Sequence, residues 1–177
     1  MPKTAPWILM SMLAACGGGD GGDKATDNGD KTETTPAPRP SVLPTEFAKS
    51  GDAAIDAMRQ STVEVGKRPR NMAEKIKVQH VLIAFEGAQR SEVKRSKDEA
   101  EKLAAKVFEE AKSGTKFITL MQRYSTDPGG GEYEMTQDQM VKGFNDISFR
   151  LEVDEVGVAP YDEANSPFGW HVIKRLE

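Results

Sequence analysis

The sequence predicts an α+β fold with an antiparallel sheet for its C-terminal part, and three observations lead to this prediction. Ile76 to Phe85 is an apolar run rich in Val, Ile and Phe and bounded by a glycine, as is typical of a buried strand. Amphipathic helical patterns follow it. A second apolar run, Phe168 to Leu176, comes last. A strand, then helices, then strands is an order that favours α+β.

Apolar residues at helical spacing, together with end signals, predict the helices. The first helix has a capping box formed by Ser96 and Glu99, and Gly114 stops it. Two shorter helical stretches follow, separated by the break at Asp127 to Gly131 and a short extended piece. A weak strand precedes the closing one. The predicted helical stretches and the weak strand are 96–113, 115–124, 140–147 and 153–158.

Composition excludes several classes of function. The 177 residues carry a formal net charge of -4, which argues against nucleic acid as a partner. A single cysteine excludes a disulfide framework and a thiolate zinc site, and two distant histidines do not form a helix-borne metal pair. We find no phosphate-binding glycine loop and no serine nucleophile elbow. The sequence therefore predicts no cofactor and no metal.

The N-terminus has the charged start, short apolar middle and small-residue end of an export signal. Its last four residues, Leu13 to Cys16, resemble the lipobox of bacterial lipoproteins. That resemblance implies a signal peptide at 1–15 and a lipidated Cys16 that anchors the exported chain to a membrane. Gly17, rather than Asp, follows the cysteine, which by the same resemblance implies the outer membrane, with the protein facing the periplasm.

The remaining chain divides into three predicted parts. Residues 16–44 are rich in Gly, Pro, Asp and Thr, and we expect them to form a disordered tether. Residues 45–74 contain a short helix that Asp52 could cap, but few apolar residues, so we expect a partly helical stalk. Residues 75–177 hold the predicted core and form the folded domain.

Two histidines lie on strands, His80 in the first and His171 in the last. If these strands are neighbours, the two side chains share one face of the sheet. A pair of structural histidines is the alternative reading. The pairing nevertheless marks this face as the candidate site.

Several strings, taken in order, resemble a parvulin-type peptidyl-prolyl isomerase domain over about the last 103 residues, from Lys75 to Glu177. Each string alone is weak, and their order makes the resemblance specific. The resemblance implies a four-stranded antiparallel sheet wrapped by three to four helices, with a concave face that holds a prolyl peptide. The strings are VQHVLI at 78–83, RSKDEA at 95–100, SGTKF at 113–117, YSTD at 124–127, QM at 139–140, FRL at 149–151 and FGWHVI at 168–173.

The resemblance also assigns residues. It implies that the catalytic set is His80, Asp127, His171 and Ser166, and that the substrate-binding set is Met140, Phe144, Tyr133 and Phe168. Two departures from the family lie near this site. Tyr133 stands where the family has Leu, and the stretch 159–165 is longer than usual.

The function implied is catalysis of X-Pro bond rotation in unfolded or exported polypeptides, with no covalent intermediate and no cofactor. A catalytically weak holdase chaperone that uses the same concave face is the alternative. An adhesive or scaffolding lipoprotein is a third reading, for which the tether would also serve.

Overall fold

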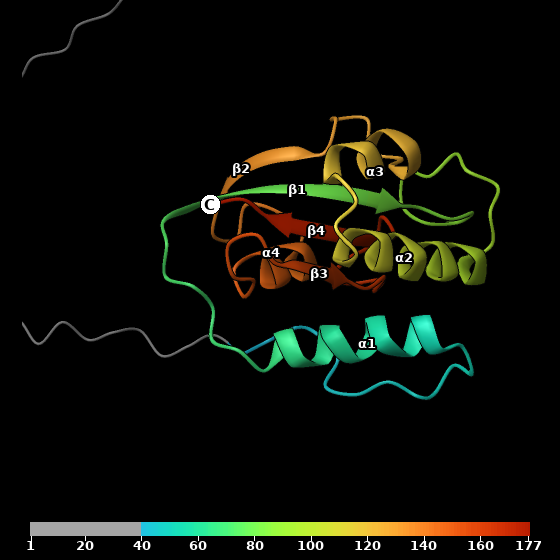
Figure 1. Cartoon of the computed structure of the whole chain (residues 1–177), viewed down its shortest axis with the longest axis horizontal. Coiled ribbons are helices and arrows are strands. Elements are labelled where there is room, and N and C mark those ends of the chain that lie inside the picture. Colours follow the sequence, from blue (N-terminus) through green and yellow to red (C-terminus); the bar gives the residue numbers. More distant parts are fainter. Residues whose placement is uncertain (1–39) are drawn as a thin grey trace, which may run out of the picture. The chain divides into compact units, whose positions relative to one another are not determined.

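The computed structural model describes residues 40–177, in which four strands form one antiparallel sheet and four helices surround it (Figure 1). The strand order is β2-β1-β4-β3, so the first and last strands are central neighbours, as the sequence analysis required. The elements are α1 (Ala53–Gly66), β1 (Lys75–Ile83), α2 (Lys97–Lys112), α3 (Phe117–Tyr124), β2 (Glu132–Thr136), α4 (Lys142–Ser148), β3 (Val156–Ala159) and β4 (Trp170–Arg175).

The sheet has an apolar cluster on each face because side chains alternate along β1. Val81 and Ile83 pack with α1, α2 and α3 on one face. Ile76 and Val78 pack with α4 on the other face. His80 and Leu82 share the face of Val78, so the histidine lies beside α4 and away from the larger helices. The predicted α+β fold and its antiparallel sheet are confirmed.

The local signals act as predicted. Ser96 and Glu99 make the reciprocal bonds of a capping box at the start of α2. Gly114 follows this helix with a φ of 91°, a conformation that favours glycine. The closing strand is slightly shorter than its apolar run. The weak strand predicted at 153–158 begins later, at Val156, because Asp154 turns the chain with a φ of 67°.

Helix α1 corrects the expectation of a stalk over 45–74. Asp52 caps it as expected, but the helix continues to Gly66 and packs against α2 and β3. Its side chains Ile55, Met58 and Val65 are buried in the two clusters. The few apolar residues of this segment sit on one side of a helix, so they are enough to join the domain core even though they could not build one.

The end of the predicted tether is also corrected. Leu43 is buried in the cluster that contains α4, and the Ser41 hydroxyl donates to Asp146 of that helix. Residues 41–43 therefore pack against α4, although composition placed them in a disordered segment. The predicted signal peptide, Cys16 and the rest of the tether to residue 39 lie outside the described residues.

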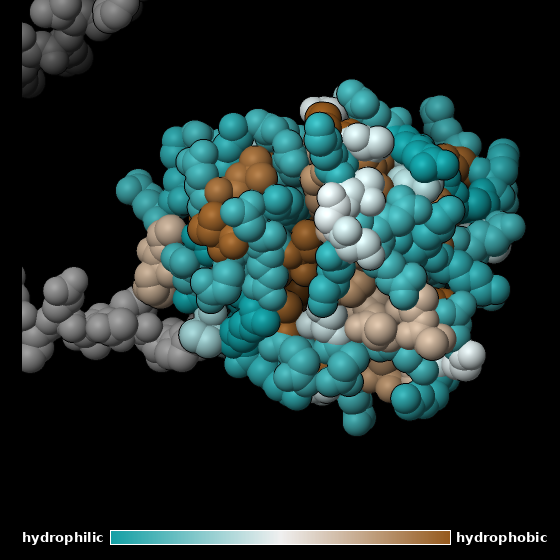
Figure 2. Space-filling view, viewed as in Figure 1, coloured by the Kyte–Doolittle hydropathy of each residue, from teal (hydrophilic) through white to brown (hydrophobic). Residues whose placement is uncertain are grey.

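The surface seen in Figure 2 is mostly hydrophilic, with hydrophobic residues gathered in small patches. Among the described residues, four large apolar side chains are exposed, and they lie in different segments of the chain. They are Val42, Met72, Ile118 and Val153. Single exposed apolar residues are normal on a protein surface.

Candidate functional site

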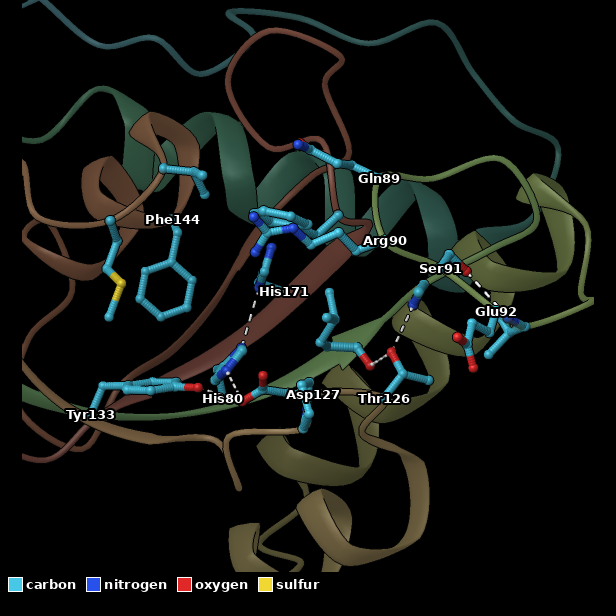
Figure 3. A pocket seen from close by; sticks show the side chains of 17 residues that line it. His80, Gln89, Arg90, Ser91, Glu92, Thr126, Asp127, Tyr133, Phe144 and His171 are labelled. Carbon is cyan, nitrogen blue, oxygen red and sulfur yellow. Dashed lines mark hydrogen bonds and ion pairs between the residues drawn. The ribbon is translucent and has the colours of Figure 1, made fainter.

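A cavity of about 770 Å³ opens on the face of the sheet that carries His80. Its floor comes from β1 and β4, and its walls come from α4, the loop 86–96 between β1 and α2, and the segment between α3 and β2 (Figure 3). The lining is mostly apolar with a few polar groups, which is usual for a ligand site. It includes seven of the eight predicted cavity residues, namely His80, Asp127, Tyr133, Met140, Phe144, Phe168 and His171.

The two histidines meet because β1 and β4 are paired. His171 lies opposite Leu82 in the antiparallel register, so it shares a face with His80. The two Nδ1 atoms are 3.2 Å apart, and the rings stack with their centroids at 5.3 Å. Both side chains are buried. The structure therefore brings together the histidine pair that the sequence predicted.

Asp127 reaches the pair from the segment that follows α3. This segment is fixed to β1, since the backbone N–H of Thr126 donates to the carbonyl of Leu82, and Ser125 Oγ accepts from the N–H of Leu82. Asp127 Oδ2 then lies 3.1 Å from His80 Nε2. That hydrogen bond holds the pKa of Asp127 well below its ordinary value, against the effect of burial. The carboxylate stays ionised at neutral pH.

Tyr133 adds a second donor to the same carboxylate. It pairs with Val78 across the β1–β2 ladder, and its hydroxyl donates to Asp127 Oδ2 at 2.7 Å. Burial raises the pKa of Tyr133 to about 12, and the bond to Asp127 acts in the same direction. The phenol is therefore protonated and able to donate.

The carboxylate determines where the protons of the histidine pair lie. Because Asp127 only accepts, His80 carries a proton on Nε2 and, when neutral, offers a bare Nδ1 to His171. His171 then donates from its own Nδ1. Burial, together with the neighbouring His80, lowers the pKa of His171 to about 3, so His171 is neutral at pH 7. Its buried Nε2 has no hydrogen-bond partner among the residues the structure describes.

Phe144 of α4 forms the apolar wall beside this network. Its ring meets the rings of His80 and His171 edge-on, at centroid distances of 5.1 and 5.2 Å. Met140 and Phe168 complete this apolar part of the lining. A flat apolar recess thus lies directly against polar groups that can orient a peptide amide.

Ser166, predicted in the catalytic set, is the exception. Its side chain is buried, its hydroxyl donates to the carbonyl of Gly169 at 3.3 Å, and it does not line the cavity. The residue fixes the turn before β4. Its hydroxyl is used within this turn, which is why it does not face the cavity.

The loop between β1 and α2 supplies cavity residues that sequence reasoning did not assign. Arg90 has a φ of 58° and places its guanidinium 5.9 Å from the ring centre of Phe168. The basic residues Arg90, Lys94 and Arg95 are the signal that the sequence offers for this loop, and basic residues are also typical of a solvated loop. The unassigned lining residues are Leu82, Ala84, 89–93, Thr126, Pro128 and Val141.

Within residues 40–177, no group of three or more His, Cys, Asp or Glu side chains is arranged to hold a metal ion. The chemistry that the described groups offer is proton placement, hydrogen bonding and apolar contact.

Comparison with known proteins agrees with this arrangement. Residues 64–177 match the model of the PPIC-type PPIASE domain. The chain is 35% identical over 105 residues to foldase protein PrsA 4 of Bacillus cereus, covering 56% of this chain and 31% of that protein. It is 30% identical over 120 residues to chaperone SurA of Pseudomonas syringae, covering 63% of this chain and 25% of that one. The chain thus spans a third or less of the length of these relatives.

A solved structure supports the fold. Peptidyl-prolyl isomerase ESS1 from Candida albicans superposes with a TM-score of 0.53 at 23% identity, covering 68% of this chain and 73% of that one. The family match includes the whole sheet and every residue of the histidine network. The chain belongs to the PPIC-type, or parvulin, family of peptidyl-prolyl isomerase domains.

Proposed function

We propose that this protein catalyses cis-trans isomerisation of X-Pro bonds in unfolded or exported polypeptides and so assists their folding. One observation carries the proposal. The hydrogen-bonded network of His80, His171 and Asp127 lies against the apolar wall of Phe144 in a single cavity. The family relationship and the foldase among the relatives support the same activity.

Prolyl isomerisation requires only that the barrier to rotation about one bond be lowered. Rotation about an X-Pro bond crosses a barrier of roughly 20 kcal/mol because amide resonance must be broken. Uncatalysed, it takes tens to hundreds of seconds. Reaching milliseconds requires a reduction of the barrier by about 6 kcal/mol. No covalent intermediate, metal or cofactor is needed, since the bond only rotates.

The cavity residues divide this work. Met140, Phe144 and Phe168 hold the proline ring and fix one side of the bond. His80, His171 and Asp127 present a preorganised polar surface to the other side, and it favours the twisted amide over the planar one. Because these groups are already hydrogen-bonded, they need little rearrangement during the reaction.

The test is a protease-coupled isomerisation assay with the purified full chain and a panel of X-Pro peptides. We expect the isomerisation rate to rise in proportion to protein concentration and to survive a chelator. A folded protein that leaves the uncatalysed rate unchanged for every peptide would contradict the proposal. Suppression of client aggregation by that inactive protein would favour the holdase instead.

We also propose that the chain is an exported lipoprotein anchored through lipidated Cys16 to the outer membrane, facing the periplasm. The pattern from Leu13 to Cys16 supports this proposal, and the glycine-rich stretch after it could serve as a tether. No helix within residues 40–177 is long and apolar enough to cross a membrane. Replacing Cys16→Ser should abolish acyl labelling and release the protein from the membrane fraction, and unchanged fractionation would contradict the anchor.

A further inference from the structure

Tyr133 makes a contact that goes beyond lining a pocket. Its hydroxyl donates to Oδ2 of Asp127, the same oxygen that lies 3.1 Å from His80 Nε2. The phenol ring also tilts against the imidazole of His80, with the ring centroids 5.4 Å apart. One residue of β2 thus touches two members of the proposed catalytic network at once (Figure 3).

The backbone around the site leaves room for this hydroxyl. A Cβ added at Gly129 would fall well inside contact distance of the Tyr133 hydroxyl. The backbone of Gly129 does not have the positive φ that favours glycine at Gly130 and Gly131. The absent side chain, and not the backbone conformation, therefore distinguishes this position. Gly129 also donates its N–H to Oδ1 of Asp127 at 3.3 Å.

These contacts hold the Asp127 carboxylate from both ends. Oδ2 accepts from Tyr133 and His80, while Oδ1 accepts from Gly129. A carboxylate held only by His80 could rotate about its last side-chain bond and release the ring. Once released, His80 could move its proton from Nε2 to Nδ1, which would leave two N–H groups facing each other across the histidine pair.

We propose that Tyr133 is a positioning residue of the isomerase site, which fixes the Asp127 carboxylate against His80 and thereby selects one proton arrangement for the two histidines. The inference rests on the proposed function, since it assigns Tyr133 a part in the same reaction. It goes beyond the expectation that Tyr133 belongs to the substrate-binding set. Tyr133 acts through Asp127 and is distinct from the groups that face the twisting amide.

A neutral donor suits this purpose. A lysine or arginine in the place of Tyr133 would neutralise the carboxylate and weaken its attraction for His80. A phenol whose pKa is about 12 stays protonated, orients the carboxylate and leaves its charge in place. Besides Asp127 and Tyr133, the charged or titratable groups of the cavity lining are His80, His171, Arg90 and Glu92.

The first test compares Tyr133→Phe with the parent chain, using the whole protein. The substitution removes the hydroxyl and keeps the ring against His80. We expect kcat to fall about tenfold while KM changes by less than about twofold, because the hydroxyl aligns the network and does not bind substrate. A rise in KM with kcat retained would overturn the proposal, since Tyr133 would then be part of the substrate-binding surface alone.

Tyr124→Phe is the matched control. Its hydroxyl also donates to a carboxylate, Oε1 of Glu110 at 3.2 Å, but it does not line the cavity. We expect this variant to keep both kcat and KM. An equal fall of kcat in the two variants would mean that losing any such bond slows the enzyme through general loosening, and would overturn the specific role of Tyr133.

A second readout is independent of activity. The sequence has only two histidines, so ¹⁵N imidazole spectra report the network directly. In the parent we expect His80 protonated at Nε2 and His171 at Nδ1, and in Tyr133→Phe a second tautomer of His80. Unchanged tautomers would overturn the proposal. If the parent proves to have no isomerase activity, the proposed function fails, but the spectra still decide whether Tyr133 controls the histidines.

Gly129→Ala tests the same contact through shape, without altering the tyrosine. The added methyl group should push the hydroxyl away from Asp127, because the far end of the Tyr133 side chain is what it meets. We expect a fall in kcat similar to that of Tyr133→Phe, and no further fall when the two are combined. Additive losses in the double variant would show two separate effects and would contradict a shared contact.

Discussion

Asp127 lines the cavity, and Asp146 lies on the helix that carries Phe144. These two carboxylates are held by different kinds of hydrogen-bond donor. Asp146, on α4 two residues after Phe144, has no exposed side-chain surface. It accepts from Ser41 Oγ and from the Nε atoms of Arg70 and Arg150, the last two at 2.8 and 2.9 Å. Burial would raise the pKa of Asp146, but the hydrogen bonds of Ser41 and Arg70 and the charge of Arg150 bring it below its ordinary value.

Asp127 has no permanent cation among these close partners. A histidine, a phenol and a backbone N–H hold it, and its side chain remains 12% exposed to the cavity. The two sets of donors differ because Asp146 has a structural role and Asp127 belongs to the proposed catalytic network. Guanidinium groups keep their charge at all accessible pH values and lock α4 in place, while neutral donors align Asp127 and leave its charge available to the histidines.

The first prediction concerns removal of the charge of Asp146, and it has the largest expected effect on stability. Asp146→Asn keeps the shape but leaves Arg70 and Arg150 buried without their shared anion. We expect a loss of about 3–5 kcal/mol in the free energy of unfolding, as is typical when one partner of a buried ion pair is removed. Urea unfolding at neutral pH measures it.

Asp127→Asn is the matched comparison. It should destabilise the fold much less and reduce kcat much more, because it leaves no guanidinium group buried without its anion and it disturbs the histidine network. If both variants lost the same free energy of unfolding, the distinction between a structural and a catalytic carboxylate would be wrong.

The second prediction concerns the apolar wall that Asp146 holds in position. Phe144→Ala removes a ring that is 3% exposed and contacts both histidines. We expect a loss of about 3 kcal/mol in stability, in the range known for large-to-small core changes. KM should rise and kcat should fall together, since the ring both binds and orients the proline. Stopped-flow isomerisation beside a melting curve checks this, and intact kinetics in a folded variant would remove Phe144 from the site.

The sequence predicted the site better than it predicted the way the site is held. The ordered strings, and the family resemblance that they support, gave the histidine pair, Asp127 and Phe144. The histidines and Phe144 lie on strands and a helix with clear local patterns, and Asp127 lies at the recognisable break after α3. The sequence did not predict the hydrogen bonds and ion pairs around Asp146. Ser41, Arg70 and Asp146 are far apart in the chain and come together only in the folded domain. Composition even assigned Ser41 to the tether and Arg70 to the partly helical stalk.

The position of Ser166 outside the cavity lining could not be predicted from the sequence for a related reason. A hydroxyl near the last strand could face either the cavity or the turn, and only the fold decides between them. Residues 45–74, predicted as a stalk, likewise belong to the domain, because Met58 and Val65 pack into apolar clusters formed mainly by other helices and strands. Helical spacing reveals such a face, but it does not say what will cover it.

The third prediction is a pH dependence of stability that comes from the catalytic network. The pKa of His171 falls from 6.5 to about 3 on folding, chiefly through burial. Between these values the unfolded chain binds a proton that the folded chain does not, so stability is full above pH 6.5 and declines as the pH falls toward 3. We expect a loss of about 2 kcal/mol between about pH 6.5 and 5 from this group.

Urea unfolding at several pH values, in the parent and in His171→Asn, measures this contribution. The decline should flatten in the variant. Asp127 and Asp146 act at lower pH, because their pKa values lie below the ordinary 3.8 and their stabilisation is lost only as the pH falls below that region. An identical slope in parent and variant would mean that His171 is protonated in the folded protein, and would contradict a neutral His171.

The last prediction tests how the structural carboxylate tolerates the loss of a weaker partner. Ser41→Ala removes one hydroxyl donor from Asp146, while the backbone N–H of Val42 and both guanidinium groups continue to hold it. We expect a loss of about 1.5 kcal/mol in the free energy of unfolding, at the lower end of the range for one hydrogen bond to a charged group. Both kcat and KM should stay unchanged, because the arginines alone keep α4 and Phe144 in position. A fall in kcat at full stability would mean instead that the segment before α1 controls the cavity through α4, so that Asp146 would belong to the functional machinery as well as to the scaffold.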